Sequence, residues 1–122
     1  MEAADNIDNG LISKNNHLYE VFTTIAEKYQ DKPAIITESQ SISYNDLKQE
    51  SIYLGAYLEN LSKNTGEIIG IFLDRSADYV VAIMSILKAK MTFLPIDQYY
   101  PNERIKYIIN DSKVKIIITK KK

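Results

Sequence analysis

The fold is decided by one stretch of the sequence, Ile86-Leu87-Lys88-Ala89-Lys90-Met91-Thr92-Phe93-Leu94-Pro95-Ile96-Asp97-Gln98-Tyr99-Tyr100-Pro101-Asn102-Glu103-Arg104. Its first residues are typical of the end of a helix, and 92–94 predicts a short apolar strand. Pro95 and Asp97 break that strand, because proline lacks an amide hydrogen and Asp favours turns. Pro101 suits the first position of a further helix, where its missing amide hydrogen costs nothing.

The same alternation continues on both sides of this stretch. Residues 67–73 are apolar on both faces, which is typical of a parallel strand covered by helices. A helix at 76–89 is apolar over most of its circumference and should be largely buried. A helix at 101–111 and a strand at 114–119 follow. This order, with connections long enough for right-handed crossovers, predicts an α/β fold: a mostly parallel sheet with helices on its faces.

The first half of the chain has two further helices and two short strands. Apolar residues at helical spacing predict helices at 17–30 and 44–61. Short strands are expected at 34–37 and 41–43, joined by a turn. Ser43 is the expected N-cap of the second helix, because its hydroxyl can accept the amide hydrogen three residues on.

The chain divides into a leader and one folded unit. Residues 1–16 are rich in Asn, Asp, Gly and Ser and predict a flexible leader. Residues 17–122 then form the α/β unit. The core of this unit is expected to centre on Ile69, Ile71, Leu73, Val80, Ile83, Leu87, Leu94, Ile116 and Ile118.

The composition excludes several classes of function. The 122 residues carry a net charge of −1, so nothing favours nucleic acid or an anionic membrane as partner. The absence of Cys excludes disulfides and Cys-type zinc sites, and agrees with the cytoplasmic location that we expect. His17 is the sole histidine, and a surface position is expected for it rather than a role as a metal ligand.

Stretch 86–104 closely resembles the second core motif of amino-acid adenylation domains. These domains belong to the AMP-forming synthetase/ligase superfamily and occur in nonribosomal peptide synthetases. Four more segments resemble family motifs in the same order: Phe22 with Lys32-Pro33-Ala34, then 42–47, 70–76, and 109–112 followed by 116–119. The resemblance covers about 18–119.

The chain departs from the family pattern at Lys90, at Met91 and at the helix end Ser62-Lys63, which lacks the family's second Gly. The family usually has Gly where Lys90 stands and often a small residue where Met91 stands. Gly suits a helix C-terminus that needs a left-handed backbone. Lys90 in that conformation would cost roughly 1 kcal/mol.

The resemblance implies an activity and its cofactors. Family members join ATP and a carboxylate, with magnesium, into an acyl-adenylate and pyrophosphate. The phosphopantetheine thiol of a carrier protein, or coenzyme A in cousin enzymes, then takes the acyl group. A chain that starts at Met1, with only a short leader before the family's first helix, is expected to be a loading module or a free-standing adenylation enzyme.

The resemblance also implies that residues 17–122 are a partial N-terminal subdomain, truncated before the phosphate loop. That Ser/Thr/Gly-rich loop lies beyond the family strand matching the one that ends at Thr119. The four glycines, at 10, 55, 66 and 70, are never adjacent or spaced Gly-x-Gly, whereas a phosphate loop needs clustered glycine amides. We therefore expect this chain to be catalytically incomplete. Its expected binding partner is the remainder of the adenylation domain.

No residue is assigned a catalytic, cofactor-binding or metal-binding role from the sequence. The expected carboxyl ends of the strands carry polar residues with structural explanations. Asp74 or Ser76 can cap the following helix, Asp97 suits a turn, and Arg75 can pair with a nearby carboxylate. Core or boundary packing is expected for Tyr29, Tyr57 and Tyr79.

A second reading belongs to a different class of function. The chain would then be a non-catalytic α/β interaction module, or a remnant, that keeps the fold. The sequence downstream of Lys122 discriminates the two: an open frame with a Ser/Thr-Gly-Thr-Thr-Gly-like loop supports the enzyme, and a stop supports the module.

Overall fold

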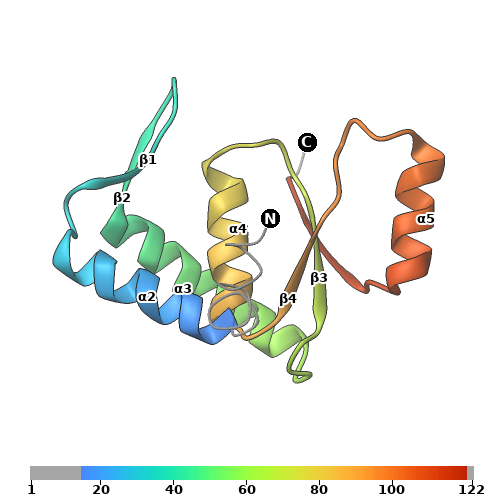
Figure 1. Cartoon of the computed structure of the whole chain (residues 1–122), viewed down its shortest axis with the longest axis horizontal. Coiled ribbons are helices and arrows are strands. Elements are labelled where there is room, and N and C mark those ends of the chain that lie inside the picture. Colours follow the sequence, from blue (N-terminus) through green and yellow to red (C-terminus); the bar gives the residue numbers. More distant parts are fainter. Residues whose placement is uncertain (1–14, 121–122) are drawn as a thin grey trace, which may run out of the picture.

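The computed structural model describes residues 15–120, and Figure 1 shows the arrangement of their helices and strands. In chain order the elements are α2 (Asn15–Lys28), β1 (Pro33–Ile36), β2 (Ser41–Ser43), α3 (Tyr44–Leu61), β3 (Ile68–Phe72), α4 (Ala77–Lys88), β4 (Thr92–Pro95), α5 (Asn102–Ser112) and β5 (Ile116–Thr119). Every predicted element is present close to its expected bounds. Residues 1–14 of the expected leader lie outside the described residues, and α2 already begins at Asn15.

The three C-terminal strands form one parallel sheet. β3 lies in the centre, with β4 and β5 on its two sides. In the register, Ile69 lies opposite Phe93 of β4 and Ile116 of β5. β1 and β2 form a separate antiparallel hairpin, seen at the upper left of Figure 1. The predicted α/β fold with a mostly parallel sheet is therefore confirmed.

Helices α4 and α5 lie on opposite faces of the sheet (Figure 1). The crossover from β3 to β4 steps one way, and the crossover from β4 to β5 steps back across β3. Because parallel crossovers are right-handed, two steps in opposite directions place their helices on opposite faces. The two faces are covered unequally, since α4 has six buried residues and α5 has none.

The main core lies between β3 and the helix α4. Ile69 and Ile71 of β3 have no exposed surface, and neither has Ile86 of α4. Leu58 of α3 and Met91 before β4 belong to the same cluster. The continuous apolar run of β3 is buried because helices and neighbouring strands surround it.

A second core joins α2, α3 and the opposite face of α4. Phe22 and Ala26 of α2 pack with Leu47 of α3 and Val81 of α4. Helix α4 therefore contributes to both cores, which explains why its apolar residues cover most of its circumference.

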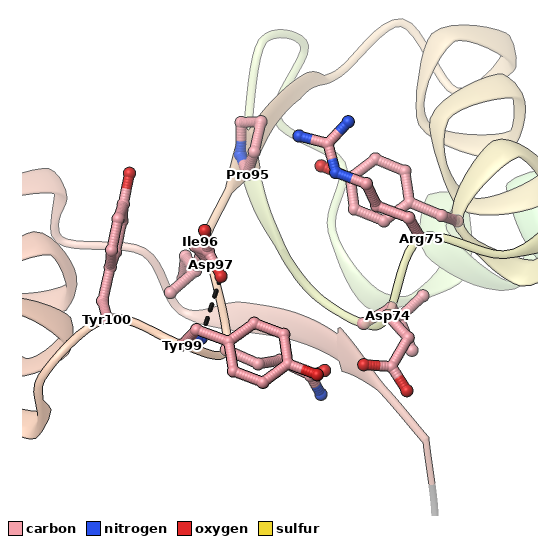
Figure 2. A pocket seen from close by; sticks show the side chains of 10 residues that line it. Asp74, Arg75, Pro95, Ile96, Asp97, Tyr99 and Tyr100 are labelled. Atoms are coloured by element: carbon pink, nitrogen blue, oxygen red, sulfur yellow. Dashed lines mark hydrogen bonds between the residues drawn. The ribbon is translucent and has the colours of Figure 1, made fainter.

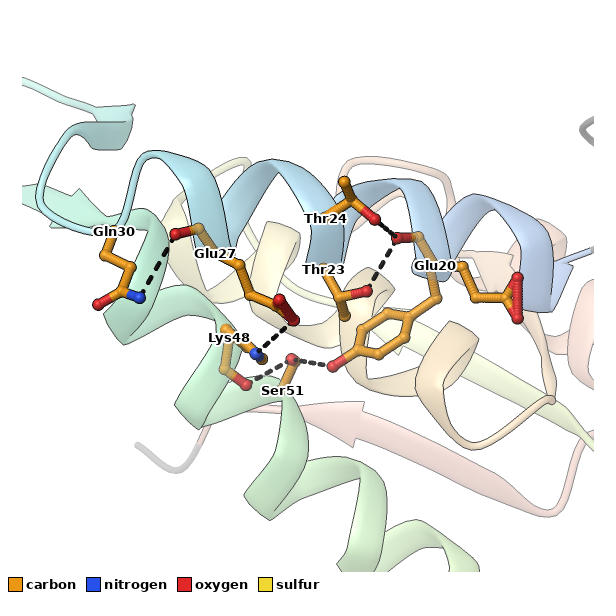
Figure 3. Close-up of polar contacts among 8 residues, drawn as sticks. Glu20, Thr23, Thr24, Glu27, Gln30, Lys48 and Ser51 are labelled. Carbon is orange, nitrogen blue, oxygen red and sulfur yellow. Dashed lines mark hydrogen bonds and ion pairs between the residues drawn. The ribbon is translucent and has the colours of Figure 1, made fainter.

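A hydrogen-bond network joins α2 to α3 beside this second core. The Tyr19 hydroxyl and the Ser51 Oγ lie 2.9 Å apart, and Ser51 Oγ also donates to the Lys48 carbonyl oxygen at 2.8 Å. Glu27 and Lys48 form an ion pair of 3.6 Å above it (Figure 3). Ser51 is fully buried, so its hydrogen bonds satisfy a group that would otherwise be costly to desolvate.

Helices α3 and α4 approach each other closely at Gly55. A Cβ atom there would lie 3.1 Å from the Ser85 carbonyl oxygen and 2.8 Å from Lys88 Cδ. Lys88 Nζ reaches Glu59 of α3 at 3.0 Å, which adds an ion pair beside the contact. The missing side chain at Gly55 therefore lets the two helices meet.

The predicted core was only partly right. Ile69, Ile71, Leu73 and Leu87 are buried as expected. The residues that are only partly buried are Val80, Ile83, Leu94, Ile116 and Ile118. Leu94 and the two isoleucines lie on the edge strands β4 and β5, which have a neighbour on one side only.

The ends of three helices test the predicted caps. Ser43 Oγ accepts the Asp46 amide hydrogen at 3.1 Å, as expected. Ser76 occupies the N-cap position of α4, one of the two residues expected there, but its side chain makes no capping hydrogen bond and its hydroxyl donates to the Asp74 carbonyl oxygen instead. Pro101 is the N-cap of α5 and not its first helical residue, so the helix begins one residue later than predicted. Lys90 has a φ of 61°, the left-handed conformation expected at that position.

Candidate functional site

A cavity of about 480 Å³ lies at the carboxyl ends of β3 and β4. The loop after β3 leads to α4 and the loop after β4 leads to α5, on opposite faces of the sheet. Two adjacent parallel strands whose connections diverge in this way form a topological switch point, where open α/β sheets place their ligands. The position of the cavity therefore follows from the strand order.

The loop after β3 supplies one side of the cavity. Leu73 is buried at its base, and Asp74 and Arg75 follow. Figure 2 shows the Arg75 guanidinium beside Pro95, whereas the Asp74 carboxylate lies on the other side of the loop and points away from it. Within residues 15–120, Arg75 forms no ion pair. The expected pairing of Arg75 with a nearby carboxylate is therefore wrong.

The loop after β4 supplies the opposite side. Ile96 is buried, and its amide donates to the Ile71 carbonyl oxygen at 2.9 Å, which continues the pairing of the two strands. Asp97 Oδ1 accepts the Tyr99 amide hydrogen at 2.8 Å (Figure 2). This side-chain turn confirms the structural role predicted for Asp97, and it fixes the loop that presents Tyr99.

Three tyrosines are among the residues that line the cavity. They are Tyr79 of α4, Tyr99 and Tyr100. Tyr99 is 87% exposed, so most of its ring is open to a ligand. The Arg104 guanidinium lies over the Tyr100 ring, 4.7 Å from its centroid. Of the two arginines of the chain, Arg75 lines the cavity, and Arg104 is linked to it only through its contact with Tyr100.

The tyrosines expected in core or boundary packing divide into two groups. Tyr79 packs partly buried against the main core, as expected. Tyr57 is 60% exposed, which contradicts the expectation, and Tyr29 is 39% exposed. The contribution of Arg104 was missed, because helical spacing indicates which face of α5 is apolar but not where its first turn lies relative to Tyr100.

A second polar cluster lies at the opposite end of the sheet. Ser62 Oγ donates to Glu67 Oε1 at 2.8 Å, and Asn64 Nδ2 donates to the same oxygen at 3.3 Å. These two hydrogen bonds stabilise the carboxylate and lower the pKa of Glu67 below its ordinary value. The polar groups of this cluster bond to one another and hold the loop together. The cavity therefore remains the stronger candidate site.

Neither region resembles a metal centre. Residues 15–120 contain no group of three His, Cys, Asp or Glu side chains that could hold a metal ion. His17 is exposed, as the sequence indicated. None of the helices in this part of the chain is long and apolar enough to cross a membrane.

The fold and the place of the cavity define an open-sheet α/β domain. The family described as "AMP-binding enzyme" matches residues 22–122. The chain therefore belongs to the AMP-binding enzyme family. Stretch 86–104, on which the family was inferred, lies inside the matched residues.

Curated relatives narrow the relationship. The chain is 34% identical over 109 residues to tyrocidine synthase 1 of Brevibacillus parabrevis, covering 89% of this chain and 10% of that protein. It is 38% identical over 112 residues to bacitracin synthase 1 of Bacillus licheniformis, covering 92% of this chain and 2% of the relative. The chain thus spans a tenth or less of the length of these two relatives.

Solved structures share the fold. The N-terminal subdomain of Klebsiella oxytoca NpsA superposes with a TM-score of 0.76 at 22% identity, over 83% of this chain and 26% of that one. The nonribosomal peptide synthetase FmoA3 gives 0.81 at 23% identity, over 84% of this chain and 11% of that one. The predicted relationship to the N-terminal part of nonribosomal peptide synthetase adenylation domains is confirmed.

Proposed function

We propose that the chain forms the N-terminal part of a domain that activates an amino acid or another carboxylic acid with ATP for nonribosomal peptide synthesis. The observation that carries the proposal is the family match over residues 22–122, together with the shared fold of NpsA and FmoA3. In such a domain the acid becomes an acyl-adenylate and pyrophosphate leaves. The phosphopantetheine thiol of a carrier protein then accepts the acyl group.

We further propose that this chain alone is catalytically incomplete. Magnesium with ATP needs oxygen ligands and a cradle of backbone amides for the phosphates. Residues 15–120 lack a three-acid cluster, and the chain lacks paired glycines. These residues do not fit the nucleotide and its metal, so no catalytic step is assigned to them. Their proposed role is a packed support for the phosphate loop and the acid pocket of the remaining domain.

The test is ATP–pyrophosphate exchange dependent on an added acid. We expect none from the 122 residues alone, at any amino or aryl acid. The same chain, extended by the sequence that its gene encodes after Lys122, should catalyse exchange with one preferred acid. Exchange by the isolated chain would show that the site lies within it.

A carrier protein is the proposed later partner. One solved relative is an artificial fusion of NpsA with a carrier domain, described as an adenylation–PCP di-domain. An extended chain that is soluble and folded, yet catalyses no exchange across a panel of acids, would contradict the proposed function. That result would favour the interaction module.

A further inference from the structure

The two arginines of this chain differ from three of its lysines in their partners. Lys48, Lys88 and Lys120 each form an ion pair with a carboxylate. In the described part of the chain neither Arg75 nor Arg104 forms one. Arginine presents a planar fork of donors that matches carboxylate and phosphate oxygens, and it stacks on aromatic rings.

The cavity brings buried apolar residues and polar residues together. The apolar residues Leu73, 9% exposed, and Ile96, 2% exposed, line it together with three tyrosines. Its volume of about 480 Å³ falls within the range of small-ligand pockets. Such pockets combine apolar contact for the body of a ligand with a few polar groups that orient it.

The two carboxylates of the cavity must be compatible with an anion. Asp97 Oδ1 accepts the Tyr99 amide hydrogen, so backbone dipole already stabilises that charge. Asp74 points away from the Arg75 guanidinium (Figure 2). Neither carboxylate therefore occupies the donors of Arg75, which remain available to a ligand.

We propose that this cavity binds a small ligand carrying an oxyanion, a phosphate monoester or a carboxylate, on a planar body. Arg75 holds the oxyanion, Arg104 adds the second positive charge beside Tyr100, and the planar body lies against the exposed Tyr99 ring. The site is separate from ATP–pyrophosphate exchange, and its test does not depend on that activity.

The test uses the whole chain and its arginine side-chain Nε–Hε signals in ¹H–¹⁵N NMR spectra. Because the chain has two arginines, two signals are expected, and the Arg75→Gln and Arg104→Gln variants assign them. The probes are phenyl phosphate, benzoate and phenol, at constant ionic strength. Phenyl phosphate or benzoate should shift both signals saturably, whereas phenol should not. Whichever of phenyl phosphate and benzoate binds more tightly shows whether the oxyanion is a phosphate monoester or a carboxylate.

Variants separate a built site from general charge attraction. Arg75→Gln should weaken binding of the better probe by about tenfold or more, because a charge-assisted hydrogen bond is lost. The affinity of Arg75→Lys for the probe should lie between those of the parent chain and Arg75→Gln, since lysine keeps the charge but lacks the planar fork of donors. Lys63→Gln, a charge-matched change at the other end of the sheet, should bind like the parent chain.

Three results would overturn the proposal. The first is the absence of saturable shifts at both arginines. The second is equal binding of phenol and phenyl phosphate. The third is an equal loss of binding in Lys63→Gln and Arg75→Gln. The Lys63 and Arg75 side chains are both exposed. Unchanged backbone amide spectra of the variants would show that folding is intact.

Discussion

The Gly66 amide donates a hydrogen bond of 3.0 Å to the carbonyl oxygen of Lys90, and both residues have positive φ angles. The Thr92 amide donates to the Glu67 carbonyl oxygen at 2.9 Å in the same region. Together these bonds join the turn before β3 to the turn before β4, so they set the start of the parallel pair. One turn uses glycine for its left-handed residue, and the other uses lysine.

Replacing Lys90 by Gly should stabilise the chain. A non-glycine residue in the left-handed region is strained, and relief of that strain outweighs the greater freedom of glycine in the unfolded chain. We expect the free energy of unfolding to rise by roughly 0.5–1 kcal/mol, measured by urea denaturation. Lys90→Ala removes the same side chain but keeps the strain, so an equal gain in that variant would contradict the explanation.

Two serines before helices should differ in their effect on stability. Ser43→Ala removes the hydroxyl that accepts the Asp46 amide hydrogen, and should lower the free energy of unfolding by about 1 kcal/mol. Ser76 makes no such cap, so Ser76→Ala should change stability by clearly less. Urea midpoints of the two variants provide the comparison. Equal losses would mean that the side-chain caps are not what distinguishes the two helices.

The α3–α4 contact should not tolerate a large residue at Gly55. Gly55→Leu would place its side chain against the Ser85 carbonyl oxygen and displace Lys88 from Glu59. Overpacking of this kind costs about 1–3 kcal/mol. Ala56→Leu is the matched control, because position 56 is the exposed neighbour in the same helix. Thermal unfolding should separate the two variants, and a shared transition temperature would count against close packing.

The central strand should dominate the stability of the sheet. Ile71 is fully buried, so Ile71→Ala should cost about 2–5 kcal/mol through lost burial and the resulting cavity. Ile117 on the edge strand β5 is 38% exposed, so Ile117→Ala should cost less. Denaturant titration followed by circular dichroism measures both. If Ile71→Ala leaves the midpoint unchanged, β3 is not the centre of the core.

Acid should weaken the loop closed by Glu67. Hydrogen bonds from Ser62 and Asn64 lower the pKa of Glu67 from its ordinary value of 4.5. Their contribution to stability is therefore complete above that value and is lost as the pH falls through the lower folded-state pKa. Ser62→Ala removes the larger cause, so NMR titration should place the pKa of Glu67 closer to the ordinary value. An unchanged pKa in Ser62→Ala would show that the hydroxyl is not the cause.

Local patterns in the sequence were enough to predict the elements, but not how each strand is covered. The apolar run of β3 and the Ser43 cap depend on neighbouring residues, and both were predicted correctly. Burial of Ile116 depends on whether another strand lies beside β5, which no pattern within that segment encodes. This is why the edge strands were predicted as core.

The candidate site was predictable only as separate pieces. The turn formed by Asp97 follows from local side-chain chemistry, and it was predicted. The association of Arg104 with the same cavity depends on how α5 crosses back over the sheet. The unpaired state of Arg75 likewise depends on where the Asp74 side chain points, which adjacent sequence positions do not determine.

The order β4-β3-β5 has a consequence for synthesis on the ribosome. The central strand β3 emerges first of the three, and its second neighbour, β5, ends at Thr119. The helix α2, the hairpin and α3 can therefore associate early, while one edge of β3 waits for the last strand to leave the exit tunnel. A nascent chain paused before β5 presents that open edge to chaperones and to other nascent chains.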